Sequence, residues 1–137
     1  PFTHLRLGMA VGDTIKWIYV THTSKSLYDV LKDGKYKATK VGRKLWKSLL
    51  TGSSLQLHCN QEGFNVGGQS QMHSRVRIGI IANEQNDCST PDSRIGFGGT
   101  GSVCGIDPNT AVGNGAGCGG DLGNKNVKAD FGWLLAR

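Results

Sequence analysis

Residues 75–99, RVRIGIIANEQNDCSTPDSRIGFGG, determine the fold class because an alternating apolar strand runs directly into a polar loop. The two faces of the strand carry Val76, Ile78 and Ile80 on one side and Arg75, Arg77 and Gly79 on the other. This period of two residues is typical of a half-buried β-strand. The loop that follows is rich in carboxylates and amides and has no nucleophile next to a base. It is therefore equipped to bind a polar ligand rather than to break bonds.

The loop of residues 83–94 is the candidate ligand-binding site, together with an aromatic residue just beyond it. Its members are Asn83, Glu84, Asn86, Asp87, Asp92, Arg94 and Phe97. Such polar groups make the directed, charge-assisted hydrogen bonds that select sugar hydroxyls, while an aromatic ring packs against the sugar. In a second interpretation calcium is bound by Glu84, Asp87 and Asp92, although their spacing differs from that of an EF-hand. A third is a disulfide-anchored turn whose Asp and Asn side chains cap backbone amides.

Four cysteines, Cys59, Cys88, Cys104 and Cys118, are scattered along the chain without a CxxC pair. An even, scattered set favours two disulfides formed in an oxidising compartment over zinc binding or redox chemistry. Three pairings exist for four cysteines, and the sequence does not choose among them. We therefore expect a secreted, extracellular protein. Because the chain begins at Pro1 rather than methionine, we also expect a processed form or a fragment.

The length of 137 residues fits a single domain that covers residues 1–137. The 21 glycines predict many turns and close backbone approaches. No run of the sequence approaches the ~20 apolar residues that a transmembrane helix needs. The expected fold is α+β: a β-rich antiparallel sheet with two short helices and long glycine-rich loops held by disulfides.

The expected elements follow from periodicity, caps and glycines. Strands are predicted over residues 5–11, 14–21, 55–59 and 127–137, a short helix with Ser24 as N-cap ends at Gly34, and a second helix covers residues 42–50. In the first helix Leu27, Val30 and Leu31 have helical spacing. Residues 96–123 are rich in glycine and poor in large apolar side chains, so they are predicted to form an ordered loop rather than core.

Half of the sixteen lysines and arginines lie in one basic segment of the chain. Its members are Lys25, Lys32, Lys35, Lys37, Lys40, Arg43, Lys44 and Lys47. Such a surface suits nucleic acid, a sulfated glycan or an anionic membrane. The polar side of an amphipathic helix explains much of it, and no nucleic-acid-binding motif accompanies it, so no nucleic acid partner is expected.

A second polar segment, residues 107–126, supplements the candidate site. Asp107, Asn109, Asn114, Asp121, Asn124 and Asn126 alternate there with glycines. Their oxygens suit a cation or a polar ligand. The four histidines are isolated from one another, and no serine lies in a GxSxG elbow. We therefore expect no enzyme and no required cofactor.

The chain resembles the terminal module of secreted marine-invertebrate proteins in four stretches: HCNQEGFNV, GKYKATKVGRKLWKSLLTGSSLQ, NDCSTPDSRIGFG and DLGNKNVKADFGWLLAR. These include fibrinogen-related proteins and cnidarian skeletal organic matrix components. The chain departs from typical fibrinogen-like domains because it lacks their GGWT-type core and their aspartate-rich calcium loop. The resemblance implies an extracellular ligand-binding module.

The sequence and the resemblance together predict a secreted carbohydrate-binding protein, a lectin, that acts without catalysis. A small lectin gains avidity from several copies, so we expect a closed homo-oligomer. The alternatives are a structural extracellular-matrix or adhesion protein and a basic, membrane-active defence protein.

Overall fold

The structure is a computed structural model that describes residues 1–137. It is β-rich, with nine strands, two short α-helices and one 3-10 turn. The strands are β1 (Phe2–Val11), β2 (Thr14–Ser24), β3 (Lys37–Ala38), β4 (His58–Gly67), β5 (Arg75–Asn83), β6 (Ser93–Phe97), β7 (Val112–Ala116), β8 (Lys125–Lys128) and β9 (Phe131–Ala136). The helices are α1 (Leu27–Leu31) and α2 (Arg43–Ser48), and the 3-10 turn is η1 (Val103–Gly105). The predicted α+β class is confirmed.

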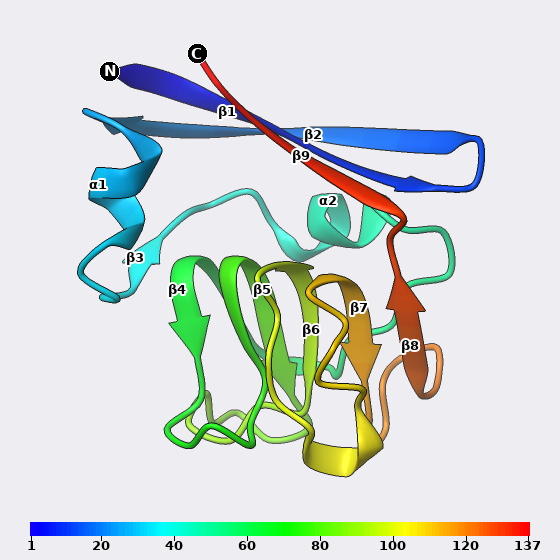
Figure 1. Cartoon of the computed structure of the whole chain (residues 1–137). Helices are drawn as coiled ribbons and strands as arrows, with labels where there is room; N and C mark the ends of the chain where they lie inside the picture. The colour runs from blue at the N-terminus through cyan, green and yellow to red at the C-terminus, as the bar shows by residue number, and fades with distance from the viewer.

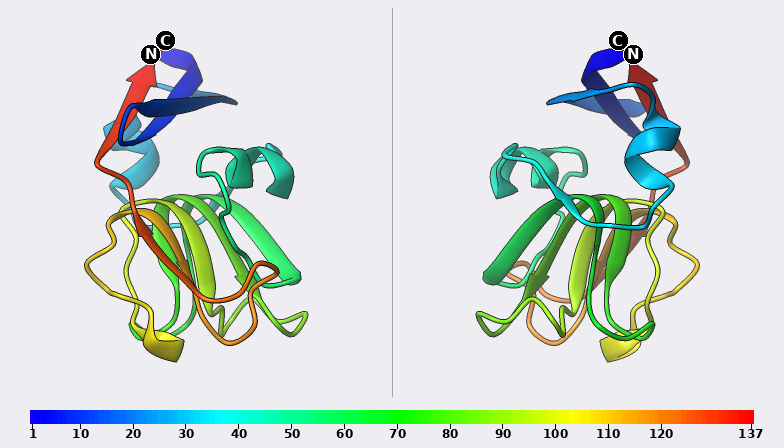
Figure 2. Two further views of the ribbon diagram at one scale, coloured as in Figure 1. Left: turned by 90° about the vertical axis from the view of Figure 1, so that its right-hand side faces the viewer. Right: turned by 90° about the vertical axis from the view of Figure 1, so that its left-hand side faces the viewer.

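The strands form two antiparallel sheets (Figure 1). A three-stranded sheet has the order β2-β1-β9, so the last strand of the chain pairs with the first. A six-stranded sheet has the order β3-β4-β5-β6-β7-β8. Helix α2 lies between the two sheets, α1 lies at one side, and the two termini are close together (Figures 1 and 2). The three-stranded sheet therefore covers one end of the six-stranded sheet and turns its other face outward.

One hydrophobic core of 18 buried residues joins both sheets and both helices. The three-stranded sheet contributes Phe2, Leu5, Leu7, Met9, Ile18 and Val20, and the six-stranded sheet contributes Phe64, Ile78, Ile80, Ala82, Ile95 and Phe97. Trp46 of α2 is fully buried at 0 % exposure. Of the predicted face, Ile78 and Ile80 lie in this core, whereas Val76 packs with Val66 and Ile81 in a second, smaller cluster.

A row of glycines crosses four neighbouring strands of the six-stranded sheet. The strand register aligns Gly63 with Gly79, Gly79 with Gly96, and Gly96 with Gly113. A Cβ atom at any of these positions would collide with a backbone carbonyl of a neighbouring strand or segment. Only glycine therefore permits the close approach of the backbones along this row.

A buried carboxylate fixes the entry of α2. Glu62, 8 % exposed, lies on β4 and accepts four hydrogen bonds. The donors are the backbone amides of Val41 and Gly42, the Thr39 hydroxyl and the Trp46 indole Nε1 (2.8 Å). Since these donors saturate both oxygens, the burial of this charged group is compensated.

The first helix begins two residues later than predicted. Ser26, not Ser24, is the N-cap, and its hydroxyl accepts a hydrogen bond from the Asp29 amide at 3.0 Å. Ser24 instead ends β2. Gly34 follows the helix with a positive φ of 69°, as predicted for its end. The second helix, predicted over residues 42–50, is α2, and Gly42 is its N-cap.

The predicted strand over residues 55–59 is wrong for its first half. β4 begins only at His58, and the preceding segment is irregular, with residues 53–56 buried and Leu57 exposed. Its backbone bonds to side chains instead of to a neighbouring strand: the Ser54 amide donates to Asn114 Oδ1 (2.8 Å) and the Gln56 amide to Ser93 Oγ (3.0 Å). The alternating residues of this segment are therefore held by hydrogen bonds from their backbone to side chains, not by pairing with another strand.

The glycine-rich residues 96–123 are not all loop. They contain the end of β6 and the whole of β7, whose residues from Gly113 to Ala116 are buried. Small residues fit there because Gly113 lies in the glycine row. The last strand predicted over residues 127–137 divides into β8 and β9, which belong to different sheets. The chain crosses between the sheets at Ala129 and Asp130.

Both predicted disulfides are present, and the structure supplies their pairing. Cys59 of β4 pairs with Cys88 in the loop after β5, and Cys104 of η1 pairs with Cys118 just after β7. No cysteine is free. Neither helix approaches the length and apolar character that crossing a bilayer requires.

Candidate functional site

The outer face of the three-stranded sheet carries apolar and aromatic side chains, of which Ile15, Tyr19, Phe131 and Leu135 are exposed. Its rows, read across β2, β1 and β9, are Tyr19–Arg6–Leu135, Trp17–Gly8–Trp133 and Ile15–Ala10–Phe131. The alternate residues of β1 face the core, so these rows point away from it. Tyr19 and Phe131 are each 67 % exposed. We call these nine residues the aromatic face.

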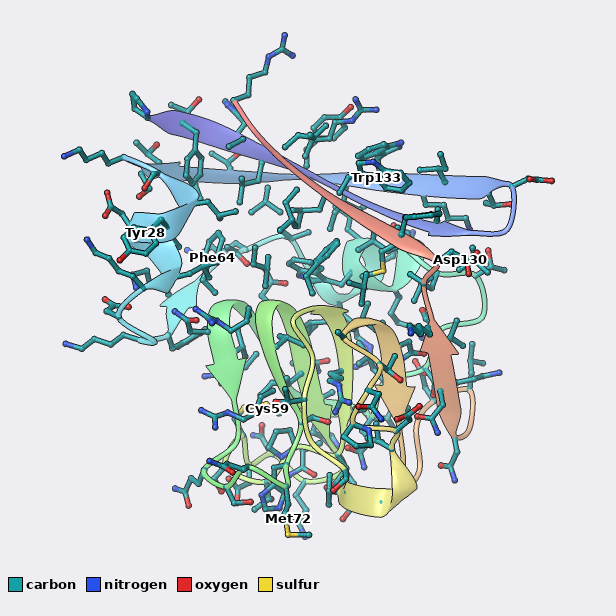
Figure 3. All side chains as sticks on the ribbon, in the orientation of Figure 1. Tyr28, Cys59, Phe64, Met72, Asp130 and Trp133 are labelled. Atoms are coloured by element: carbon teal, nitrogen blue, oxygen red, sulfur yellow. A yellow bond between two sulfur atoms is a disulfide. The ribbon has the colours of Figure 1, made fainter.

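Trp133 lies in the middle row of the aromatic face, on the edge strand β9. Its ring centroid lies 5.6 Å from that of Trp17 and 6.1 Å from that of Phe131. Figure 3 places Trp133 on the side of its sheet that is turned away from the six-stranded sheet, whereas Phe64 lies between the sheets. Only the Trp46 indole bonds within the protein, so the indole N–H groups of Trp17 and Trp133 are free to bond a ligand.

Gly8 and Arg6 hold the Trp17 ring in place. A Cβ atom at Gly8 would lie 2.5 Å from Cζ3 of Trp17, so the ring packs flat against the bare backbone of β1. The Arg6 guanidinium carbon lies over the same ring, 4.0 Å from its centroid. This cation–π contact orients Arg6 while leaving its N–H groups unbonded.

A hollow opens at the Arg6 end of the aromatic face. It is lined by His4, Leu5, Arg6, Tyr19, Leu135, Ala136 and Arg137. No aspartate or glutamate is among these residues. The hollow therefore combines apolar surface, a phenol and cationic side chains.

The loop predicted as the ligand site connects β5 to β6, and part of it is exposed. Glu84, Asn86 and Asp87 are exposed to solvent. Asp87 Oδ1 accepts hydrogen bonds from the Ser89 hydroxyl (2.6 Å) and amide (2.9 Å), which lower the pKa of this carboxyl. The Cys59–Cys88 disulfide anchors the loop to β4. These three side chains are the members of the predicted site that a ligand can contact from solvent.

The other four predicted site residues are buried. Asn83 donates to the Asp87 carbonyl at 2.6 Å, and Asp92 is within 3.4 Å of Gln56 Nε2. Phe97, 4 % exposed, packs in the main core instead of beside a ligand. The predicted loop thus divides into an exposed rim and an internal support.

Arg94 organises the glycine-rich loop from inside. It is 1 % exposed, and its guanidinium donates to Ser74 Oγ (3.2 Å) and to the carbonyls of Gly101 (3.0 Å) and Asp107 (3.2 Å). Burial lowers the pKa of Arg94 to about 10, partly offset by Asp107. Its Nε has no partner. Arg94 therefore holds backbone rather than presenting its charge to solvent.

The three carboxylates predicted for calcium do not converge on one point. Among histidine, cysteine and acidic side chains, the one group of three whose ligand atoms converge is Asp92, Cys104 and Cys118. Both sulfur atoms of that group are in a disulfide, so they are not thiolate ligands. A calcium requirement stays a prediction.

The second polar segment braces the fold. Asn114 is fully buried and bonds to Ser54 and Arg94. Asp121 accepts bonds from Arg43 (2.9 Å), from Lys47 and from the Leu55 amide (3.0 Å).

The remaining side chains of that segment act locally or lie in solvent. Asp107 Oδ1 accepts from the Asn109 amide, and Asn126 Oδ1 accepts from the Asp107 amide, both at 2.9 Å. Asn124 is exposed. Most of these oxygens already have donors within the protein.

Half of the basic segment is paired with acidic side chains. Lys32 pairs with Asp29 and Lys37 with Asp33, while Arg43 and Lys47 share Asp121. The unpaired members, Lys25, Lys35, Lys40 and Lys44, are exposed. This arrangement agrees with a solvated surface.

Sequence reasoning missed the aromatic face, although its signal was present. Ile15, Trp17 and Tyr19 alternate with Ile18 and Val20, and Phe131, Trp133 and Leu135 alternate with Gly132, Leu134 and Ala136. Each strand therefore has apolar residues on both faces, and only one face can be turned to a core. Placing β9 beside β1 was needed to bring the two aromatic sets together.

Comparison with protein-family models, curated proteins and solved structures found no match to this chain.

Proposed function

We propose that this protein is a secreted carbohydrate-binding protein, a lectin, that binds sugar rings on the aromatic face. The observation that carries the proposal is a sheet face on which Tyr19 and Phe131 are each 67 % exposed, with the half-buried rings of Trp17 and Trp133 between them. Exposed apolar patches on small proteins mark binding surfaces. Aromatic side chains with a polar tip suit a ligand that is apolar on one face and hydroxylated at its edges.

The rim of the predicted loop is a second polar surface for the same function. Glu84, Asn86 and Asp87 offer acceptors for sugar hydroxyls. The two disulfides support the secreted location. A homo-oligomer would add avidity to weak single sites, and sedimentation velocity measures its size.

The test is a glycan array with four forms of the purified protein, run with and without EDTA. Trp133→Ala is expected to abolish the binding of the wild type, and Tyr28→Ala is the matched control. Tyr28 is an aromatic residue, 73 % exposed, on α1 outside the aromatic face. Asp87→Ala separates the loop rim from the aromatic face. Loss of binding in EDTA would establish the calcium requirement.

A blank array for the wild type in both conditions would overturn the proposal. Binding that Asp87→Ala abolishes and Trp133→Ala leaves intact would move the site to the loop rim.

An extracellular-matrix or adhesion protein is the alternative function. The observation that favours it is β9, an edge strand whose residues Phe131–Ala136 carry no charge. The buried centre of a protein interface is also apolar. Cell agglutination that free monosaccharides do not inhibit would support this alternative.

A further inference from the structure

We propose that the ligand of the aromatic face is an acidic glycan, whose carboxylate or sulfate group binds Arg6 while a sugar ring packs on Trp133. This inference rests on the proposed function and names its ligand class. It depends on three features of the face: the distribution of charge, the free donors of Arg6 and the fixed position of Arg6.

Charge is unevenly distributed along the aromatic face. The hollow at one end is lined by His4, Arg6 and Arg137 and by no acidic residue. Acidic groups lie at the other end, where Asp130 Oδ2 accepts the Gly12 amide at 2.7 Å in the turn between β1 and β2. Lys128 lines a hollow at that end together with Asp130 and Phe131, so only the Arg6 end offers positive charge without a neighbouring carboxylate.

Arg6 keeps its donors for a ligand, unlike the arginines that support the fold. Arg43 donates to Asp121 and to carbonyls, Arg77 to Asn65 Oδ1 (2.8 Å) and the Leu31 carbonyl (2.8 Å), and Arg94 to the internal carbonyls described above. The Arg6 guanidinium has no hydrogen bond or ion pair within the protein, and its planar fork matches a carboxylate or a sulfate.

Arg6 is also held in position by its neighbours. Its contact with the Trp17 ring restricts the side chain, so less conformational entropy is lost when a ligand binds. In the strand register Arg6 lies directly between Tyr19 and Leu135, one row from Gly8 and Trp133. A sugar ring on Trp133 therefore places its substituents beside the guanidinium and the Tyr19 hydroxyl.

The experiment compares matched oligosaccharides by titration calorimetry at 150 mM salt. The pairs are a tetragalacturonate with a neutral galactotetraose, and a sulfated galactan oligomer with its unsulfated form. The variants are Arg6→Gln, Arg6→Lys and Arg75→Gln. Arg75 is an exposed arginine of β5 without a side-chain partner, so Arg75→Gln removes the same charge from the other sheet.

We expect the wild type and Arg75→Gln to bind an acidic oligomer about tenfold or more tightly than its neutral partner. Arg6→Gln should bind both members of each pair equally, and Arg6→Lys should recover part of the preference. The two pairs distinguish two sources of negative charge. If the wild type prefers the acidic member of only one pair, that pair identifies the ligand as a uronate or as a sulfated sugar.

Two results would overturn the inference. Equal affinities of the wild type for acidic and neutral oligomers would do so, with the proposed function left standing. Equal losses in Arg6→Gln and Arg75→Gln would show general attraction to a protein of net charge +6 rather than a site. Absence of binding to all four oligomers, together with a blank glycan array for the wild type, would overturn the proposed function as well.

Discussion

At the scale of single residues, the buried carboxylate of Glu62 accepts four hydrogen bonds from other residues. Each of its oxygens accepts two donors, from Thr39 and Val41 on one and from Gly42 and Trp46 on the other. Glu62→Gln would turn an NH2 group toward one of these donor pairs. We expect it to lower the free energy of unfolding by about 2–4 kcal/mol, because two donors lose their acceptor inside the protein.

Urea denaturation followed by fluorescence measures this loss. Glu84→Gln is the control, since Glu84 is exposed and its carboxylate has no donor in the protein. Equal stabilities of the two variants would contradict the role of Glu62.

Asp121 makes the stability depend on acid pH. Partial desolvation raises the pKa of this carboxyl, but the bonds from Lys47, the Leu55 amide and Arg43 outweigh it and lower the pKa to about 2 from an ordinary value of 3.8. A carboxyl whose pKa is lowered by folding stabilises the protein above its unfolded pKa, and this contribution is lost as the pH falls through the folded pKa.

Asp121→Asn is therefore expected to be less stable than the wild type at pH 7. The difference should shrink between pH 4 and pH 2, because there the wild type itself loses the ionised carboxylate. Guanidinium denaturation at pH 7, 4 and 2.5 measures it. A difference that stays constant with pH would show that the charge of Asp121 does not stabilise the fold.

At the residue scale, the sequence gives the types of the residues in the predicted site but does not indicate which of them are buried. Residue types located the polar segment 83–94, but Asn83 ends β5, Arg94 lies in β6, and Cys88 of the loop pairs with Cys59 of β4. The burial of Arg94 and Asp92 could not be predicted from the sequence. Arg94 donates to a backbone group, the Gly101 carbonyl, and Asp92 bonds to Gln56, which is distant in the sequence. Local sequence carries no record of such tertiary partners.

At the scale of elements, the glycine row shapes the six-stranded sheet. Gly79→Ala and Gly96→Ala would each drive a methyl group into a carbonyl of the neighbouring strand, that of Ile95 and that of Ile78 respectively. We expect each to cost about 2–3 kcal/mol, as overpacking against a backbone that cannot move aside. Thermal denaturation followed by circular dichroism measures both.

Gly34→Ala is the matched control for this prediction. Gly34 has a positive φ of 69°, but a Cβ atom there would have no neighbouring atom within 4 Å, so only backbone strain of about 1 kcal/mol is expected. A loss for Gly79→Ala no larger than for Gly34→Ala would refute the close-approach argument.

Elements with strong local signals were predicted well, and those defined by pairing were not. β1, β2, β5 and both helices follow from alternation, caps and helical spacing. β7 has only glycine, asparagine and alanine after Val112, so its membership in the sheet depends on the row that it completes with β6. The division of β8 from β9 depends likewise on their partners β7 and β1.

At the scale of the whole molecule, the shared core makes the two sheets one folding unit. The core cluster contains residues of β1 and β2 as well as of β4, β5 and β6, with Trp46 buried among them. Neither sheet can leave the other without exposing this core to water. With both disulfides intact, unfolding is therefore expected to be a single two-state transition.

The measurement follows urea unfolding by two probes at once: far-ultraviolet circular dichroism for the strands of both sheets, and tryptophan fluorescence of a Trp17→Phe, Trp133→Phe variant in which only Trp46 emits. The chain has three tryptophans, so this variant isolates the buried one. Coincident curves, with a calorimetric enthalpy equal to the van't Hoff enthalpy, are expected. Two separated transitions would show instead that the three-stranded sheet, and the aromatic face with it, folds and unfolds independently of the six-stranded sheet.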